Sequence, residues 1–415
     1  MTLRHLLLLP LAAWFLSGSS AFALGFRIID QDADATARGN AFTATADNPS
    51  AVYYNPAGIT QLDGMQSLLN GYGIVFDSRA ELAAPGSKAF STKYDPQFAP
   101  SSFATLHIEG TPITIGYGLY APFGFALRYP DTTPFRTLAK EGSIELLTLN
   151  PVIAVKITRS LSFAIGPTIN YGTALLVRGI VAPGDQFRVR GAGFGEGFNA
   201  GLMWQPHPMH SFGLTYFSPI DLDFGGYTNT FFKNVEIPVE VAPGVFKKEV
   251  VVKGENARDE SANTPFNFPQ HITLGYSFRP TPEWNFEADV DWTDWDSLNT
   301  QVIARNSGPV SIPFNWRSSY IYEFGVTRFF GLWHVSAGYV RSQNSVPNQS
   351  FNPLIPDSDR NILECGVGRK LGKLSWTLAY QYSWAEKRTI SQGTIADGAY
   401  SFQGNAISLS LGYHF

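Results

Sequence analysis

The sequence predicts an all-β protein, a transmembrane antiparallel β-barrel of about fourteen strands. Three observations predict it. Side chains alternate with a period of two from Met65 onward, aromatic residues stand at both ends of apolar faces, and short connections alternate with long ones. The composition agrees, because only 15% of the 415 residues are charged, whereas soluble domains usually carry about 25%.

Charge and cysteine content exclude several other classes of protein. The net charge of -4 offers no basic surface for nucleic acid. The single cysteine, Cys365, excludes an internal disulfide and a cysteine-rich metal site.

Residues 1–23 are predicted to be a secretory signal peptide. Arg4 gives a basic start, an apolar run extends from Leu6 to Leu16, and Ala21-Phe22-Ala23 fits the small-x-small cleavage rule. The alternative is a membrane-spanning helix, but the apolar run is shorter than the roughly 20 residues that a span needs. Later stretches do not approach a helical span either, so we expect the chain to enter a membrane as strands.

The alternation separates two chemically different faces. In residues 375–384, 284–292 and 406–415, one face is aromatic and aliphatic and the other is small and polar. The polar face is mostly Ser, Thr, Asn and Gly with a few acids, as in a barrel interior, whereas a soluble β-sandwich would present Lys and Glu to water. A β-sandwich enzyme is the alternative fold. Two pairs of tryptophans place rings at the levels of two membrane interfaces: Trp376 with Trp384, and Trp284 with Trp292.

The same alternation locates the strands. They are expected to start near Met65, Ser101, Pro112, Ser143, Leu161, Arg190, Ser211, Gln270, Trp284, Ser318, Trp333, Asn361, Leu374 and Tyr400. Long connections are expected over Asp77–Pro100, Ala121–Gly142, Gly225–Pro269 and Asn344–Arg360, with short turns between them. An even strand number with short turns at one rim is typical of outer-membrane barrels, and the terminal Phe415 is in phase with the outward face.

Residues 24–64 do not alternate and are rich in Ala, Thr, Asp and Asn. The segment is too short to fold alone, so it either trails free or plugs the lumen. We therefore expect a signal peptide over 1–23, a separate segment over 24–64 and the barrel over 65–415.

Several motifs follow one another in the order of a known family. The first segment contains Gly25-Phe26, Ala37-Arg38-Gly39-Asn40-Ala41 and Asn55-Pro56-Ala57. Tyr120-Ala121-Pro122-Phe123-Gly124, Trp292-Thr293-Asp294-Trp295 and Ile355-Pro356-Asp357-Ser358-Asp359-Arg360 come later. The ordered set resembles the FadL family of outer-membrane transporters for long-chain fatty acids and other hydrophobic compounds. The resemblance implies a fourteen-stranded barrel whose lumen holds residues 24–64 as a hatch.

The resemblance also implies a function, the passive uptake of a fatty acid, a detergent-like lipid or an aromatic hydrocarbon. Such a ligand would be caught among the extracellular loops, reach a luminal pocket above the hatch and leave sideways at a kink in the third strand. The expected setting is the outer membrane of a Gram-negative bacterium, with membrane lipid and lipopolysaccharide around a monomer. The alternative is an adhesin or a lipid-acting enzyme that uses the long loops. The loop Gly179–Val189 is shorter than in the best-known members, so no capture-site residues are transferred.

The residues expected at the kink and lateral opening are Gly116, Gly118 and Pro122. Both glycines are in phase with the inner face of the third strand, where they either permit a bend or make room for the hatch.

Charged residues are expected to hold the hatch. The inward acids are Glu287, Asp289, Asp291 and Glu323, and buried like charges need cationic partners. The candidate partners are Arg27 and Arg38 in the hatch and the inward-phased Lys156, Arg178 and Arg305. Our hypothesis is that some of these pairs, with Asn55, Pro56 and Ala57, hold the hatch closed. The alternative is a set of hydrated carboxylates with no role in gating.

No catalytic, metal or cofactor site is predicted. Asp30-x-Asp32-x-Asp34 opens like a calcium loop, but it has Ala35 at the sixth position and Ala41 at the twelfth. The seven histidines lack His-x-x-x-His spacing, and the sequence contains no Gly-x-Ser-x-Gly elbow.

Overall fold

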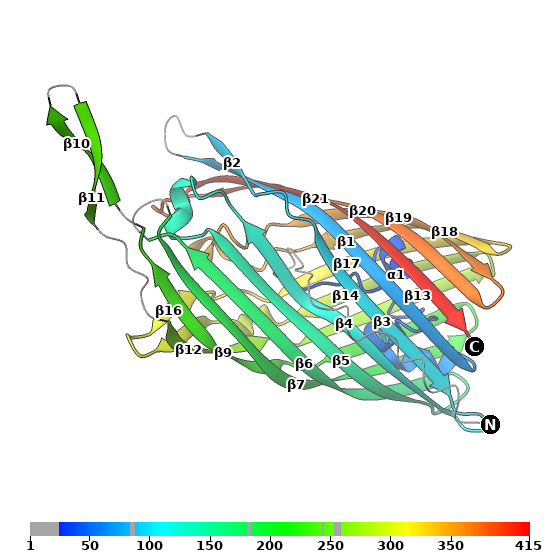
Figure 1. Cartoon of the computed structure of the whole chain (residues 1–415). Coiled ribbons are helices and arrows are strands. Elements are labelled where there is room, and N and C mark those ends of the chain that lie inside the picture. The colour runs from blue at the N-terminus through cyan, green and yellow to red at the C-terminus, as the bar shows by residue number, and fades with distance from the viewer. Residues whose placement is uncertain (1–24, 84–87, 181–183, 234, 243–244, 253–258) are drawn as a thin grey trace.

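A computed structural model describes residues 25–83, 88–180, 184–233, 235–242, 245–252 and 259–415. The predicted signal peptide lies outside these residues. The chain forms a closed antiparallel β-barrel (Figure 1). Among the helices of the described part, none is long and apolar enough to span a bilayer.

The barrel wall has fourteen strand positions, which confirms the predicted number. Six of them are single strands in the first half of the chain: β1 (Met65–Leu82), β3 (Gln97–His107), β4 (Ile113–Arg128), β5 (Glu141–Lys156), β6 (Leu161–Arg178) and β7 (Gln186–His207). Four more are β8 (His210–Phe217), continued by β9 (Ile220–Phe231); β13 (His271–Thr281), preceded by β12 (Glu260–Phe268); β14 (Trp284–Thr293), followed by β15 (Thr300–Arg305); and β17 (Ser319–Phe330). The last four are β18 (Trp333–Ser342), β19 (Arg360–Leu371), β20 (Leu374–Ile390) and β21 (Gly398–His414). Pairing of β1 with β21, from Gln66↔His414 to Leu82↔Gly398, closes the barrel.

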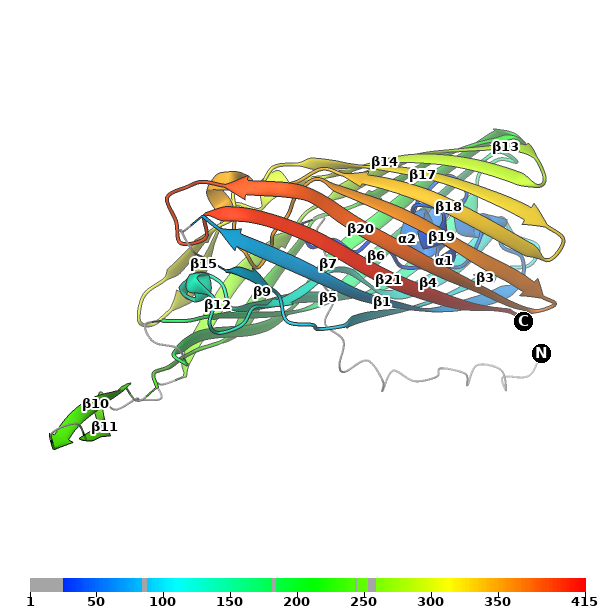
Figure 2. The ribbon, with the colours of Figure 1, turned by 90° about the horizontal axis from the view of Figure 1, so that it is seen from above.

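The two ends of the barrel differ. Short turns and the C-terminus lie at one end, here called the turn end, and the longer connections lie at the other, the loop end (Figures 1 and 2). The loop end carries β2 (Ala89–Ser91), the β15–β16 pair with β16 at Val310–Pro313, and the separate hairpin of β10 (Val235–Ala242) and β11 (Val245–Val252). Three short 3-10 helices also lie in these connections: η3 (Pro134–Thr137), η4 (Trp295–Ser297) and η5 (Asn348–Ser350).

Three of the four predicted long connections were too long, because the strands continue past the point where the alternation is clear; the connection predicted over Asn344–Arg360 agrees with the end of β18 and the start of β19. Residues 77–82 belong to β1, residues 121–128 to β4 and residues 225–231 to β9. The ladder extends these strands; Asp77, for example, pairs with Gln403. Backbone pairing does not depend on the inside-outside pattern of side chains, so the pattern marks the membrane-facing part of a strand and underestimates its length.

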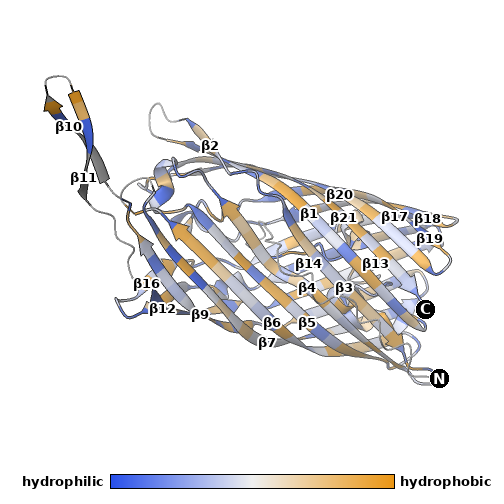
Figure 3. Ribbon diagram, viewed as in Figure 1, coloured by the Kyte–Doolittle hydropathy of each residue, from blue (hydrophilic) through white to orange (hydrophobic). Residues whose placement is uncertain are grey.

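The predicted separation of faces is confirmed. On β14, Phe286 and Val290 are 43% and 41% exposed on the outer surface, while the intervening Glu287 and Asp289 are buried. Apolar and polar colours alternate along the strands of the wall (Figure 3). Aromatic rings gather on the outside near the turn end, where Trp333 and Trp376 lie 5.8 Å apart. This is the distribution expected of a barrel with lipid outside and polar groups inside.

The N-terminal segment, residues 25–64, lies inside the barrel (Figure 2). It contains α1 (Ala33–Ala37), α2 (Ala51–Tyr54) and the 3-10 helix η2 (Pro56–Gln61), and nearly all of it is buried. We call it the luminal segment. Glycines of the wall let it approach closely: a Cβ atom at Gly338 would lie 2.0 Å from the Gly39 nitrogen. The wall and the luminal segment therefore pack backbone against backbone at this point.

Candidate functional site

Arg27 joins the start of the luminal segment to β14. Its Nη1 lies 2.5 Å from Oδ1 of Asp291 and its Nη2 lies 2.8 Å from Oδ2. Nη1 also donates to Thr293 Oγ1 at 2.9 Å. Both charged side chains are buried, so this is a bidentate, charge-assisted ion pair shielded from water.

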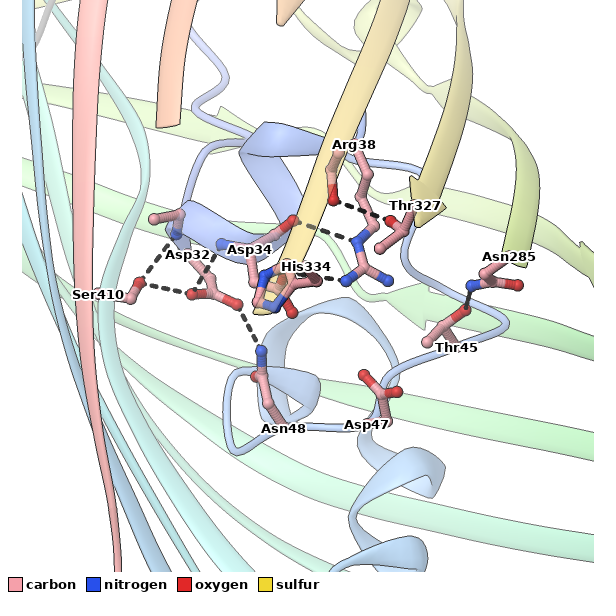
Figure 4. A network of polar contacts seen from close by, with 12 residues as sticks. Asp32, Asp34, Arg38, Thr45, Asp47, Asn48, Asn285, Thr327, His334 and Ser410 are labelled. Carbon is pink, nitrogen blue, oxygen red and sulfur yellow. Dashed lines mark hydrogen bonds and ion pairs between the residues drawn. The ribbon is translucent and has the colours of Figure 1, made fainter. Parts of the chain in front are cut away.

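Arg38 makes a second ionic contact with the same strand. Its Nη1 lies 3.3 Å from Glu287 Oε2, and its Nη2 lies 2.9 Å from Asp34 Oδ1. The His334 ring on β18 approaches the same Asp34 oxygen at 3.0 Å (Figure 4). Burial alone would raise the pKa of the Asp34 carboxyl, but Arg38 and His334 hold it below its ordinary value. Asp34 is therefore a stable anion between the luminal segment and the wall.

Asp289 binds the luminal backbone directly. One of its carboxylate oxygens accepts from the N–H groups of Phe42 at 3.0 Å and Thr43 at 2.8 Å. Glu323 lies opposite Asp289 in the β14–β17 register and is also buried. Three of the four predicted inward acids thus contact the luminal segment.

Of the predicted cationic partners, Arg27 and Arg38 meet these acids and the other three do not. Lys156 is exposed at the turn end of β5, Arg178 lies over the Phe187 ring, and Arg305 lies 3.7 Å from Glu260. Arg178 and Arg305 are at the loop end, away from the acids of β14.

The Asn-Pro-Ala turn fixes the other end of the luminal segment. The Asn55 side chain accepts from Ala57 N at 3.1 Å, which caps η2, and its amide donates to Thr43 O at 2.8 Å and to Leu202 O on β7 at 3.1 Å. Pro56 occupies the first position of η2, where no backbone donor is needed. Asn55 therefore connects two parts of the luminal segment to the wall.

The wall is interrupted between β3 and β4. The ladder between these strands runs from His107↔Thr114 to Ser102↔Leu119 and stops there. Toward the loop end, the next backbone contact between the two sides is Lys93 N to Arg128 O at 2.8 Å. Residues 97–101 of β3 still pair with β1, and residues 123–128 of β4 still pair with β5. We call the interval between these contacts the lateral gap; all residues from 93 to 128 are described.

A β-bulge in β4 lies beside the lateral gap. The β4–β5 register shifts between Tyr120 and Phe123, which is a β-bulge containing Ala121 and Pro122. At Gly116 and Gly118, by contrast, β4 pairs regularly with both neighbours. A Cβ atom at Gly116 would lie 3.1 Å from Val52 and 3.3 Å from Ile59, so the space at this glycine is taken by the luminal segment.

The start of the luminal segment binds the free edge of β4. Ile28 N donates to Pro122 O at 2.8 Å, and Gly124 N donates to Phe26 O at 2.7 Å. Arg27 and Phe123 form an isolated antiparallel bridge between these bonds. Residues 26–28 thus replace β3 as the partner of β4 beyond the bulge.

Phe26 occupies an aromatic cluster above the gap. Six rings lie within 6.1 Å of its own, measured between ring centres: Phe123, Phe125, Phe266, Phe268, Trp295 and Trp316. The side chain is fully buried. Its neighbours come from β4, β12, η4 and the segment before β17, so one ring joins several parts of the wall.

An apolar cavity of about 360 Å³ opens on the loop side of this cluster. Phe125, Phe266 and Trp316 line the cavity and also contact Phe26, and two arginines, Arg178 and Arg190, contribute to the lining. Phe26 therefore lies between the cavity and the lateral gap. The resemblance implied a luminal pocket, but the sequence did not predict which residues line it and gave Phe26 no role beyond the Gly25-Phe26 motif. The lining comes from ten separate stretches of chain between residues 125 and 394.

Residues 14–415 match the family described as outer membrane protein transport protein (OMPP1/FadL/TodX). The chain belongs to this family. The long-chain fatty acid transport protein of Escherichia coli is 21% identical over 449 residues, covering 96% of this chain and 95% of the relative. That of Salmonella typhi is 20% identical over 435 residues, covering 96% and 94%.

Solved structures share the fold. A Pseudomonas aeruginosa FadL homologue superposes with a TM-score of 0.79 at 19% identity, covering 94% of this chain and 99% of that one. The Pseudomonas putida toluene transporter TodX superposes with a TM-score of 0.73 at 15% identity, covering 94% and 100%. As a member of this family with a barrel fold, the protein resides in the outer membrane of a Gram-negative bacterium. The loop end is then extracellular and the turn end periplasmic.

Proposed function

We propose that this chain is a passive channel that takes up hydrophobic molecules and releases them sideways into the outer membrane. The observation that carries the proposal is the lateral gap between β3 and β4, which residues 26–28 of the luminal segment cover. The apolar cavity lies on the other side of Phe26. Phe26 thus contacts the lining of the cavity through its ring and the β4 edge of the gap through its backbone carbonyl.

The burial of apolar surface favours a lateral exit. Each Å² of apolar surface removed from water contributes roughly 25 cal/mol, so a hydrophobic molecule held in the cavity loses that stabilisation if it enters a water-filled pore. A route past Phe26 and through the gap keeps the molecule against apolar groups until it reaches the bilayer. In this proposal the luminal segment is the gate, and its contacts with β14 limit how far it moves.

The proposed ligands are long-chain fatty acids or related hydrocarbons, including aromatic ones. Relatives are named long-chain fatty acid transport proteins, and structural neighbours are named toluene transporters. The apolar lining of the cavity suits both classes, and Arg178 and Arg190 favour a ligand with a carboxylate. The proposed working unit is a monomer in contact with membrane lipid and lipopolysaccharide, and it carries out no catalysis.

Filling the cavity tests this proposal. Ala174 on β6 lines the cavity, and Tyr171 on the same strand is 41% exposed on the outer face. We expect Ala174→Trp to slow the transfer of 11-(dansylamino)undecanoic acid into proteoliposomes at least tenfold, because the indole fills a large part of a cavity of about 360 Å³. The control is Tyr171→Trp, which should transfer at the wild-type rate. Equal rates for both variants would refute transport through the cavity.

A further inference from the structure

Gln31 hydrogen-bonds both edges of the lateral gap. Its side-chain Nε2 donates to Ala121 O on β4 at 2.8 Å, and its backbone carbonyl accepts from Ser101 Oγ on β3 at 2.6 Å. The residue is 1% exposed. It lies at the level where β3 and β4 have ceased to pair with each other, because the last paired residues are Ser102 and Leu119.

Both side-chain donors of Gln31 are used in this position. The second Nε2 proton is donated to Ile28 O at 3.0 Å, so both donors point at backbone carbonyls. The Gln31 N–H donates to the hydroxyl of Tyr54 in α2 at 3.0 Å, and that hydroxyl donates to Ile29 O at 2.8 Å. Residues 28, 29 and 31 are therefore held in one conformation, with the amide aimed at β4.

We propose that Gln31 is the clasp of the lateral gap, a positioning residue whose two bonds keep β3 and β4 together in the closed state. The inference rests on the proposed function, since the clasp matters only if the gap is an exit. It adds a specific step: a ligand leaves when the Gln31 amide releases Ala121 or its carbonyl releases Ser101. Residues 26–28 bind only the β4 edge of the gap through their backbone bonds, so releasing them leaves this connection to β3 in place.

The two bonds can be removed separately. Gln31→Ala abolishes the bond to β4 and leaves the backbone carbonyl that accepts from Ser101. Ser101→Ala abolishes the bond to β3 and leaves the Gln31 amide unchanged. Gln31→Glu keeps the size of the side chain but places carboxylate oxygens against the carbonyls of Ile28 and Ala121, which repels rather than binds them.

The experiment measures transfer of 11-(dansylamino)undecanoic acid into proteoliposomes together with its equilibrium binding in detergent. We expect Gln31→Ala and Ser101→Ala to raise the transfer rate roughly three- to tenfold, the factor that one net hydrogen bond supports. Gln31→Glu should raise it further. Equilibrium binding should remain within about twofold of wild type, because the cavity is untouched, and the double variant Gln31→Ala/Ser101→Ala should match the faster single variant.

A second luminal glutamine provides the matched control. Gln61 donates from its amide to Thr45 O at 3.0 Å and to Ala46 O at 3.2 Å, away from the gap. Gln61→Ala should leave the transfer rate unchanged. A general loosening of the luminal segment would instead raise transfer in Gln61→Ala as much as in Gln31→Ala, and this result would overturn the proposal.

Folding is checked by the shift in electrophoretic mobility on heating, and Ser101→Ala substitutes for any Gln31 variant that does not fold. If the folded Gln31 and Ser101 variants transfer the probe at the wild-type rate or more slowly, the proposal that Gln31 holds the lateral gap closed is overturned. That result differs from a failure of the proposed function, in which the wild-type protein transfers the probe no faster than protein-free liposomes, or Ala174→Trp has no effect.

Discussion

The luminal segment meets two sides of the barrel in different ways. At β14 the wall is continuous, since this strand pairs along its whole length with β13 and β17, and it holds the segment with buried carboxylates. At β3 and β4 the wall is interrupted, and the segment completes it with backbone bonds and the Gln31 amide.

This difference indicates a division of roles within one short segment. Charge-assisted bonds between buried partners are stronger than neutral bonds, and breaking one leaves an unpaired charge. The neutral bonds at the gap exchange more readily because water or lipid headgroups replace them at a net cost of about 1 kcal/mol each. The β14 side is therefore suited to anchor the luminal segment, and the gap side is suited to open.

The largest expected effect comes from reversing a charge on the anchoring wall. Asp289→Lys places an ammonium group against the N–H groups of Phe42 and Thr43, which now bind the carboxylate. Two donors then face a cation, so we expect the luminal segment to be displaced and the single-channel conductance in planar bilayers to rise several-fold. Asp221→Lys, at an exposed position on β9, is the control. A conductance equal to that of wild type in Asp289→Lys would show that this carboxylate does not hold the segment.

The second-largest expected effect is a loss of stability when the ion pair between Arg27 and Asp291 is broken. Removing either partner alone leaves a buried charge, so Arg27→Met and Asp291→Asn should each lower the free energy of unfolding by about 3–5 kcal/mol. The double variant should recover much of that loss. Urea titration of the refolded protein in detergent measures the free energy of unfolding of the wild-type protein, the two single variants and the double variant, which together form a double-mutant cycle. Additive losses would contradict a direct interaction between the two side chains.

The smallest effect compares the two sides in the unmodified protein. Backbone amides of residues 120–128 pair with the luminal segment and β5 around a bulge, whereas those of 286–291 lie in a regular ladder on both sides. Hydrogen exchange followed by mass spectrometry should therefore be faster for 120–128, by a factor of about ten. Equal protection of the two stretches would remove the distinction between an anchoring side and an opening side.

Much of the wall could be predicted from the sequence. Residues 284–292 alternate so clearly that the outward Phe286 and the inward Asp289 were both placed on their correct faces. The pattern holds because lipid and lumen impose opposite chemistry on successive residues of a strand. It failed at the strand ends near Leu82 and Arg128, where the outer face leaves the lipid and pairing continues without the pattern.

The luminal contacts were only partly predictable. Arg27 and Arg38 were sound candidates because buried acids require cations, but the sequence could not choose between them and Arg178 or Arg305. Gln31 carried no signal, and Phe26 entered only as part of the Gly25-Phe26 motif, without a role of its own. An uncharged amide or a single aromatic ring in this segment cannot be told from an ordinary packing residue until its neighbours are known.

The sequence by itself determined the barrel, its number of strands and the inward position of its acids, because these follow from a local period repeated along the chain. Only the tertiary structure decided where the wall is interrupted. Pro122 and the inner glycines of β4 were both plausible sites for the kink, and the register showed the bulge at Ala121 and Pro122, with Gly116 accommodating the luminal segment. The lateral gap arises because β3 and β4 stop pairing and residues 26–28 of a distant segment take the place of β3 beside β4. The hydrogen bonds that residues 28 and 31 form with residues 101, 121 and 122 depend on the folding of the whole chain.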